Sequence, residues 1–546
     1  MDTFLANLHS KVTTAYHAQG TPLGSAENST PPSIDEKFPQ EFTFPSSRQP
    51  APEFRHRALA LTAAILGYTL FAYDNTVIAN VRPRIVQDLG NTADLPLLSV
   101  AYNLAIFSAN LFWGQLYRSF DAKWLFCAAV LVFEMGTAVC GAAPSIGALV
   151  GGRVIAGLGG GGIYLGTMTF VTAMTSGGER PKWLALVGVG YAAGLIAGPV
   201  IAGAFAASDP TWRWSFYLLL PIGAVLAAAY LFLLPSLHPP DGERGGSRLR
   251  RIDYLGFLFF TTAVVGFNLF PAFGGSEYSW SSPQVVGLAV CFAIVVVAFA
   301  AQQYFCLLTS RTNRCFPGHL LGWWEMCLQW AAMCMVMLSM YVPLYTIPLH
   351  LHGVKLVPYV GTMVVALLAS GGLMRKHPFY MAYFLVGGLL IVAGGVLLHF
   401  ATLKRGDGYL LGVSVLVSAG CGICGQTAFS VAQCKVKKSE DIPAATTFIG
   451  TAQVGGVSIG LVTSNSIFVN LATNRLVDIF PDSPRNEVVN AVTGADSLLL
   501  ETLAPAARRH ALELVKSAVQ DVYWLVVGSG VVLVVLALCM KRERLS

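Results

Sequence analysis

The chain has 546 residues and a net charge of +6, with 54% hydrophobic and only 12% charged residues. Soluble globular domains carry about 25% charged residues. Here the apolar residues come in runs of about 20, long enough to cross a hydrocarbon core of about 30 Å. The composition excludes a soluble globular protein and indicates an integral membrane protein. Because no basic stripe accompanies the net charge, we expect no nucleic-acid partner.

Residues 1–56 differ from the rest of the chain, since prolines recur among Ser, Thr and Gln throughout this segment. Such a composition is typical of disorder, and we expect a disordered cytoplasmic tail. The segment has no basic stretch followed by an apolar one, so it does not read as a cleaved signal peptide. The first apolar run is therefore expected to direct insertion into the membrane.

The apolar runs that follow predict an all-α integral membrane protein with fourteen transmembrane helices. We expect these spans at 58–80, 98–117, 124–143, 146–171, 183–206, 214–234, 254–273, 284–304, 326–349, 356–374, 379–400, 408–432, 443–470 and 522–540. The thirteenth span is polar, which favours burial among other helices over exposure to lipid.

The positive residues of the short loops predict the orientation of these spans. With the N-terminus inside, eighteen Lys and Arg fall in the inner loops and the C-terminal tail, against six in the short outer loops. This bias favours cytoplasmic termini. Residues 471–521 then form a long external loop, with an amphipathic helix near 500–516. We expect a plasma-membrane protein, although a vacuolar or vesicular membrane would give the same orientation.

Breaks in the pattern divide the chain into parts. Residues 57–234 are predicted to form an N-terminal six-helix bundle, and 305–546 a C-terminal six-helix bundle that includes the external loop. Between them, 235–304 comprises a basic cytoplasmic linker and two extra spans. Two six-span halves are a common transporter design, with the substrate site at their interface near the membrane midplane.

Five short motifs occur in the first half of the chain. They are Tyr73–Ile78 in the first span, Gly114–Lys123 after the second, Arg153–Gly160 in the fourth, Gly198–Gly203 in the fifth and Trp212–Tyr217 before the sixth. In this order and in these spans, the motifs resemble those of the major facilitator superfamily, specifically its fourteen-span drug:proton antiporter branch. The tightest resemblance is to fungal members that export toxins and secondary metabolites.

The resemblance implies the major facilitator fold, with two extra central helices between the bundles. It also implies a monomeric transporter, not an enzyme, that exports a small organic molecule by alternating access. The proton gradient would supply the energy, with no cofactor. A siderophore or nutrient importer on the same scaffold is the alternative. A receptor or membrane enzyme is a second rival, but no catalytic, nucleotide or metal motif is visible. The pair Cys421 and Cys424 lies in an apolar run, which favours packing over redox or metal chemistry.

The loop between the second and third spans is the predicted gating loop. It contains Gly114, Arg118, Asp121 and Lys123. Arg118 stands where the family has an acidic residue, and Asp121 stands where it has a glycine. Asp121, one turn away, is the candidate replacement for the missing acid.

Three charges lie inside predicted spans, where each costs at least about 2.5–3.5 kcal/mol at the bilayer centre. Asp74 and Arg153 fall at the same depth, about 9–12 Å below the outer face, so we expect them to form an ion pair. Either this pair exchanges protons during transport or it is a static tie between the first and fourth spans. Glu134, near mid-depth in the third span, has the same two interpretations: a proton site, or a carboxylate tied to a neighbouring helix.

Other span residues are candidates for the substrate cavity and for helix packing. Gly157 is expected to permit close packing, and Gly198, Pro199 and Gly203 to permit a bend in the fifth span. Aromatic and amide side chains suit the cavity of a large, mostly apolar ligand; any of them could instead lie at a helix interface or face lipid. The cavity candidates are Asn103, Gln329, Trp330, Tyr341 and Gln426.

Overall fold

The computed structural model describes most of the chain after residue 53. The described residues are 54–89, 95–176, 179–207, 211–237, 248–275, 278–311, 313–347, 357–374, 376–400, 406–436, 441–479, 484–493 and 505–543. The predicted disordered tail therefore lies almost wholly outside the described residues, and helix α2 begins at Phe54.

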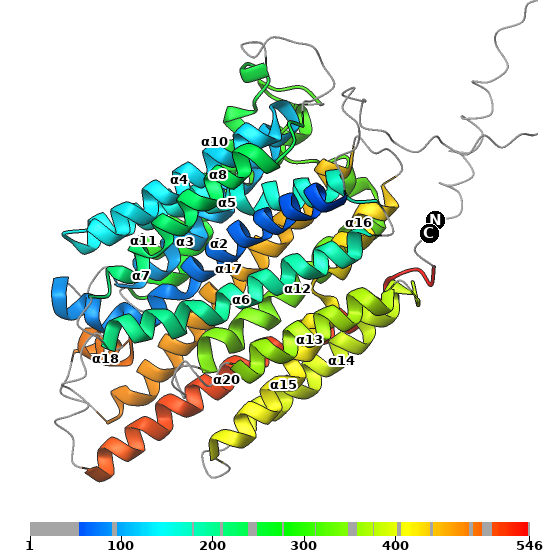
Figure 1. The fold of residues 1–546 in the computed structure, drawn as a ribbon. Coiled ribbons are helices and arrows are strands. Elements are labelled where there is room, and N and C mark those ends of the chain that lie inside the picture. Colours follow the sequence, from blue (N-terminus) through cyan, green and yellow to red (C-terminus); the bar gives the residue numbers. More distant parts are fainter. Residues whose placement is uncertain are drawn as a thin grey trace, which may run out of the picture. The chain divides into compact units, whose positions relative to one another are not determined.

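The described elements are helical, apart from an isolated bridge between Gly274 and Tyr278. Figure 1 shows the long helices running alongside one another. Their bounds are α2 (Phe54–Leu89), α3 (Leu95–Ser119), α4 (Ala122–Ala142), α5 (Ile146–Met174), α6 (Arg180–Ala207), α7 (Trp214–Tyr217), α8 (Leu219–Leu233), α10 (Tyr254–Phe273), α11 (Pro283–Phe305), η2 (Leu320–Gly322), α12 (Trp324–Thr346), α13 (Val357–Met374), α14 (Tyr380–His399), α15 (Gly406–Cys424), α16 (Thr427–Lys435), α17 (Ile442–Val477), α18 (Arg485–Thr493) and α20 (Pro505–Cys539).

Every predicted span coincides with a helix, which confirms the all-α membrane fold. The sixth span is made of α7 and α8, and the twelfth of α15 and α16. Among the described residues, twelve helices are long and apolar enough to cross a membrane. Helices α2 and α3 are not among these twelve, so the count of fourteen crossings remains a prediction.

Glycines set the closest helix contacts in the N-terminal half. A Cβ atom on Gly136 of α4 would lie 2.6 Å from the Cα atom of Ala156 in α5. A Cβ atom on Gly159 of α5 would lie 2.6 Å from the carbonyl oxygen of Ala129 in α4. No larger residue fits at either position, and close backbone approach of this kind is a main source of packing energy between membrane helices.

The segment predicted as a long external loop at 471–521 is partly helical. Helix α17 continues to Val477, and α20 begins at Pro505 and runs unbroken to Cys539. Residues 505–516, the described part of the amphipathic helix expected near 500–516, form the first part of α20. Polar contacts stabilise these extensions beyond the apolar runs: Arg475 of α17 pairs with Asp521 of α20 and donates to Ser517 Oγ at 2.7 Å.

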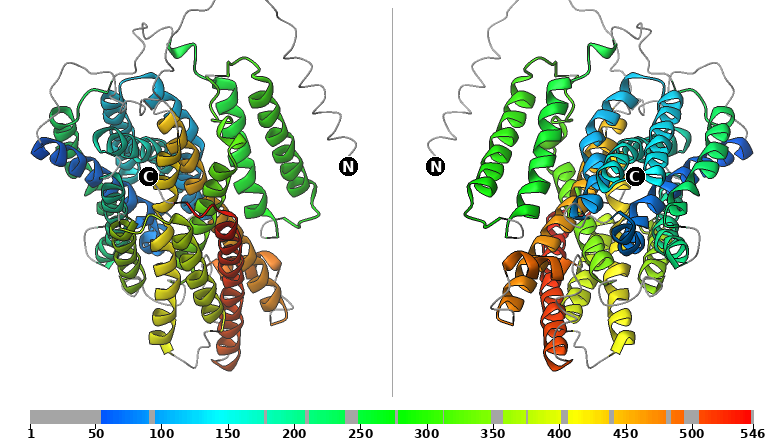
Figure 2. Two further views of the ribbon diagram at one scale, coloured as in Figure 1. Left: turned by 90° about the vertical axis from the view of Figure 1, so that its right-hand side faces the viewer. Right: turned by 90° about the vertical axis from the view of Figure 1, so that its left-hand side faces the viewer.

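Helices α10 and α11 form a pair at one flank of the bundle, visible in Figure 2. A buried carboxylate holds this pair together. Asp253, 1% exposed, caps α10 by accepting from the Gly256 N–H at 2.8 Å. It also accepts from the side-chain amides of Gln302 at 2.9 Å and Gln303 at 2.7 Å, both on α11.

The same residue links the pair to the predicted gating loop. Asp253 accepts from the Cys315 N–H at 3.1 Å, and its own N–H donates to the Gln115 side chain of α3 at 3.2 Å. The Gln115 amide in turn donates to the carbonyl of Asn313 at 2.5 Å. Burial, together with the carboxylate of Asp253, raises the pKa of the Cys315 thiol, so this thiol stays protonated at neutral pH.

We expect Asp253→Ala to destabilise the protein, because it leaves several buried donors without an acceptor, each costing about 1–3 kcal/mol. Thermal melting of the purified protein in detergent measures the loss. Asp441→Ala is the control, since Asp441 is partly exposed and its ion-pair partner is His319 at 3.4 Å. Equal melting temperatures for the two variants would contradict the anchoring role of Asp253.

Candidate functional site

An ion pair buried inside the N-terminal half is the most polar feature of its interior. Arg153 Nη1 on α5 lies 2.8 Å from Asp74 Oδ2 on α2, and both side chains are 1% exposed. The same nitrogen donates to the backbone carbonyl of Asp74 at 3.0 Å. The contact predicted from their equal depths is therefore present; whether the pair exchanges protons remains a prediction.

The local sequence positions this pair. The guanidinium of Arg153 lies over the Tyr102 ring of α3, with its Cζ atom 4.1 Å from the ring centre. One turn further along α5, a Cβ atom on Gly157 would lie 2.5 Å from the carbonyl oxygen of Tyr102. The glycine thus lets α3 approach α5 closely enough for a cation–π contact.

Next to the ion pair, α2 contacts α3 and α6 through uncharged groups. The side chain of Asn103, a predicted cavity residue on α3, donates to Asn75 Oδ1 at 3.2 Å, and Asn75 directly follows Asp74 in the chain. A Cβ atom on Gly198 of α6 would lie 2.8 Å from the carbonyl oxygen of Tyr73. Helix α6 continues through Pro199 to Ala207, with Gly203 half-buried, so neither residue ends the helix.

A cluster of aromatic rings joins the two halves. The hydroxyl groups of Tyr191 on α6 and Tyr341 on α12 hydrogen-bond to each other across the interface. On one side, Tyr68 of α2 stacks on Tyr191 with ring centres 5.2 Å apart; on the other, Tyr345 stacks on Tyr341 at 6.2 Å. Of the predicted cavity residues on the C-terminal half, Tyr341 is the one in this cluster.

The other cavity candidates lie apart from it. Trp330 Nε1 donates to Thr451 Oγ1 of α17 at 3.0 Å, and Gln329 is buried with its amide nitrogen 3.6 Å from Met540 Sδ beyond α20. Gln426 is the N-cap residue of α16. All three contact neighbours within the C-terminal half, so the structure does not bring the predicted set together.

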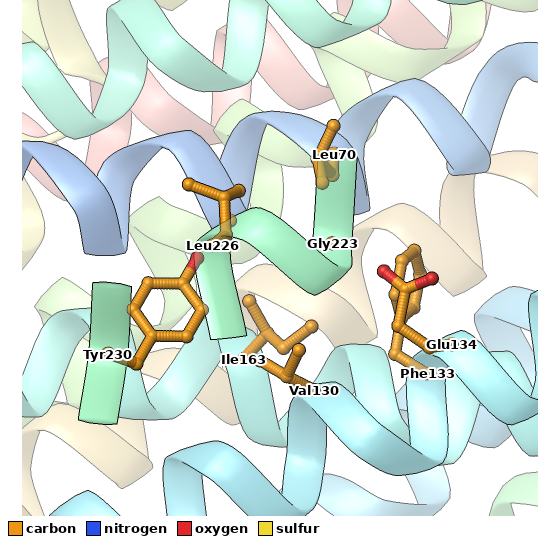
Figure 3. Close-up of a pocket in the computed structure, with 9 residues that line it drawn as sticks. Leu70, Val130, Phe133, Glu134, Ile163, Gly223, Leu226 and Tyr230 are labelled. Atoms are coloured by element: carbon orange, nitrogen blue, oxygen red, sulfur yellow. The ribbon is translucent and has the colours of Figure 1, made fainter. Parts of the chain in front are cut away.

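Glu134 lies on α4 beside a small cavity of about 10 Å³, drawn in Figure 3. Both carboxylate oxygens are buried, and neither has a hydrogen-bond partner within the described part of the chain. The structure shows no tie to a neighbouring helix, the second interpretation of this residue. The carboxylate packs directly against Gly223 of α8, where a Cβ atom would displace it. The cavity is lined by Gly67, Leu70, Val130, Phe133, Glu134, Ile163, Gly223, Leu226 and Tyr230.

The predicted gating loop lies against the C-terminal half. A Cβ atom on Gly114 would lie 2.7 Å from Thr447 Oγ1 on α17. The side chain of Arg118 donates to the carbonyl of Arg314 at 3.3 Å. Asp121 caps α4 by accepting from the Lys123 N–H at 2.8 Å. Asp121 thus has a structural role that the sequence did not indicate.

Sequence reasoning missed two hydrogen bonds that cross between the halves. Tyr164 of α5 donates to Gln453 Oε1 of α17 at 2.6 Å, and the amide of Gln433 on α16 donates to Thr172 Oγ1 of α5 at 3.2 Å. Glutamine is uncommon inside membrane spans and marks helix contacts there. A glutamine in or beside a span therefore marks a residue that contacts another helix, but the sequence does not indicate which residue it contacts.

The family comparison and three relatives of similar sequence point to the same protein family. The family described as Major Facilitator Superfamily matches residues 64–461. A transporter from Aspergillus terreus, named MFS-type transporter pgmG, is 35% identical over 94% of this chain and 91% of its own length. Efflux pump alnA of Emericella nidulans is 36% identical over 87% of this chain and 88% of its own length. MFS-type transporter patC of Penicillium expansum is 34% identical, with 95% and 98% covered.

A solved structure shares the fold at low sequence identity. The proton:xylose symporter XylE, a major facilitator protein, superimposes with a TM-score of 0.57 at 13% identity. The superposition covers 90% of this chain and 98% of the symporter. At this identity the likeness concerns the fold alone.

We expect Arg153→Met to cost about 3–5 kcal/mol of stability, because it leaves the Asp74 carboxylate buried without its cation. The double variant Asp74→Asn with Arg153→Met should lose less than the sum of the two single variants, since it removes both charges. Unfolding of the detergent-solubilised protein in a denaturant series measures these differences.

The half-exposed pair of Arg475 and Asp521 is the matched control. Arg475→Met should cost no more than about 1 kcal/mol, because solvent screens that pair. Equal losses of unfolding free energy in Arg153→Met and Arg475→Met would show that the buried ion pair contributes no more to stability than the partly exposed one.

Proposed function

This chain belongs to the major facilitator superfamily of membrane transporters, and from that premise we propose that it exports a small organic molecule in exchange for protons, by alternating access. Its members are transporters rather than enzymes. Relatives that cover most of the chain are named as efflux pumps and MFS-type transporters, which supports export of a secondary metabolite, toxin or drug. We place the carrier, as a monomer, in the plasma membrane with both termini in the cytoplasm.

The observation that carries the proton coupling is the buried pair of Asp74 and Arg153. Among the described ion pairs, this one has the least exposed partners. Removing two charges from water is costly, so evolution retains such a pair inside a membrane mainly where it serves function. A proton that binds Asp74 cancels its attraction to Arg153 and frees α2 and α5 to move apart. Protons from the acidic side would then drive the conformational cycle without any cofactor.

The residues between the halves suggest the chemistry of the cargo. The tyrosines that meet there offer ring faces and hydroxyl groups but no charge, and the nearby carboxylate of Asp74 is occupied by Arg153. Sites with aromatic walls and few polar groups suit amphipathic organic ligands. A permanently cationic drug finds no unpaired carboxylate at this contact.

An importer of siderophores or nutrients on the same scaffold is the alternative function. It shares the fold, the ion pair and the aromatic interface, so geometry does not separate it from an exporter. The direction of net flux does. The efflux names of the relatives favour export, as does the resemblance of Gly198–Gly203 to the antiporter motif of the fifth span.

The first test is gradient-driven uptake of a panel of fungal metabolites and dyes into inside-out vesicles that carry the full chain. With the vesicle lumen acidified, we expect uptake that collapses when a protonophore dissipates the gradient. Asp74→Asn should reduce this uptake to the level of vesicles without the protein, because the neutral amide cannot exchange a proton.

Two controls make the outcome specific. Asp441→Asn changes a partly exposed carboxylate outside the Asp74–Arg153 pair and should retain gradient-driven uptake. Accumulation in right-side-out vesicles, with none in inside-out vesicles, would establish import and overturn the export proposal.

Glu134 is proposed as a second proton-binding group, because its oxygens lie beside the small cavity and have no hydrogen-bond partner among the described residues. We expect Glu134→Gln to melt at the same temperature as the natural protein, since no hydrogen bond to a neighbouring helix is lost. The pH dependence of its transport rate should instead become shallower, as one titrating group is removed. A rate profile identical to that of the natural protein would remove Glu134 from the coupling scheme.

A further inference from the structure

Asn110 on α3 is an anomaly in an interior whose polar groups are mostly paired. Its side chain is 0% exposed, yet neither Oδ1 nor Nδ2 has a hydrogen-bond partner within the described residues. Leaving such a group unsatisfied costs about 1–3 kcal/mol, and native proteins rarely tolerate it without a reason. The equally buried Asn268 of α10 shows the usual situation: it donates to the Val264 carbonyl at 2.8 Å and accepts from Ser458 Oγ at 2.8 Å.

The surroundings of Asn110 come from both halves of the molecule. Opposite it on α17, Gly450 presents bare backbone; a Cβ atom there would lie 3.6 Å from Asn110 Nδ2 and 3.2 Å from the Tyr164 hydroxyl. That hydroxyl donates to Gln453 Oε1 on the same helix. Asn110, Tyr164, Gly450 and Gln453 thus form an uncharged polar group at the contact between α3, α5 and α17.

The depth of this group matches that of a central binding site. Asn110 lies nine residues before the end of α3 at Ser119, and Gln453 eleven residues after the start of α17 at Ile442. At 1.5 Å per residue these positions are about 14–16 Å from the helix ends, near the middle of a core about 30 Å thick.

The polar group is continuous with the aromatic cluster described above. The ring centre of Tyr164 lies 6.0 Å from that of Tyr68, which stacks on Tyr191. A ligand with one end bound to Asn110 would therefore have its other end packed against the rings of these tyrosines. These residues all lie on the contact between the halves, so they become accessible when the halves separate.

We propose that Asn110 is a substrate-recognition residue, and that the substrate is an uncharged ring compound bearing a hydrogen-bond donor beside a carbonyl acceptor. A carboxamide offers one acceptor oxygen and two N–H donors, so a group of this kind satisfies both of its unpaired atoms at once. A charged end would have no counter-charge here, because Asp74 and Arg153 neutralise each other. This inference rests on the proposed function for one step, namely that the interface between the halves is the cargo site.

The test compares two probes that differ by one donor. Naphthalene-2-carboxamide has a flat ring with a carbonyl and an N–H donor, whereas methyl naphthalene-2-carboxylate keeps the ring and the carbonyl but lacks the donor. Their dissociation constants are measured calorimetrically on the purified full chain in detergent. We expect the amide to bind about tenfold more tightly than the ester, as the gain of one well-placed hydrogen bond allows.

Asn110→Leu should abolish this preference: the amide loses both hydrogen bonds to Asn110 and the ester loses only the one to its carbonyl, so the affinity for the amide falls more. Asn268→Leu, which removes an equally buried amide that already has partners, should keep the preference. If Asn110 only holds a buried water, Asn110→Leu will change the melting temperature and leave the tenfold preference intact, which overturns the inference. Equal affinities of the natural protein for the two probes, or no binding of either, also overturn it.

Gly450→Ala gives an independent answer if Asn110→Leu does not fold. It leaves Asn110 in place but puts a methyl group 3.6 Å from its amide nitrogen, so it should weaken binding of the amide more than that of the ester. Binding of the probes is measured without a proton gradient. The proposal of proton-driven export and the proposal about Asn110 can therefore be refuted independently of each other. Absent proton-driven export refutes the proposed function, whereas an unchanged probe preference in both variants refutes the role of Asn110.

Discussion

Burying a carboxylate or a guanidinium in a hydrocarbon core costs several kcal/mol of desolvation free energy, and a direct contact between the two charges offsets this cost. Asp74 and Arg153 meet this condition with a 2.8 Å ion pair, a second bond to the Asp74 backbone and the face of Tyr102 beneath the guanidinium. The pair joins α2 to α5, and the glycine one turn away admits α3. The packing of three helices in the N-terminal half therefore depends on the charge state of a single carboxyl group.

The contact between the halves is built from different chemistry. Uncharged hydrogen-bonding side chains form part of it: Gln433 donates to Thr172, and the hydroxyl groups of Tyr191 and Tyr341 bond to each other. Hydrogen bonds between membrane helices are worth only about 1 kcal/mol. Under the proposed alternating-access cycle, such an interface would cost less to open than one of buried ion pairs, which cost several kcal/mol to break.

The fold could be predicted from the sequence largely because hydrocarbon permits few solutions for a long apolar run. The meeting of Asp74 with Arg153 could also be predicted, since depth along a span follows from counting residues and few charges compete. Partners across a helix surface could not be predicted in this way. Gln329 has the composition expected of a cavity residue but faces Met540, and Asp253 looks like a loop residue but accepts bonds from two helices.

Near the C-terminus, the hydropathy of the sequence did not predict the ends of the helices. The stretch near 500–516 is predicted from the sequence to form an amphipathic helix within an external loop, but its described part from Pro505 continues directly into the apolar part of α20. Just beyond this stretch, Ser517 and Asp521 of the same helix pair with Arg475 of α17. Helix boundaries outside the membrane are set by such side-chain contacts, and hydropathy carries no information about them.

The unpaired amide of Asn110 has a consequence for the resting populations of the molecule. A closed state that buries this group without a partner is raised by about 1–3 kcal/mol, which lowers its share roughly 5- to 150-fold relative to states in which the group is hydrated. Under the proposed transport cycle, a substrate that pairs with the amide would remove this cost. Occupancy would then favour the closed state and limit proton leak through the empty molecule.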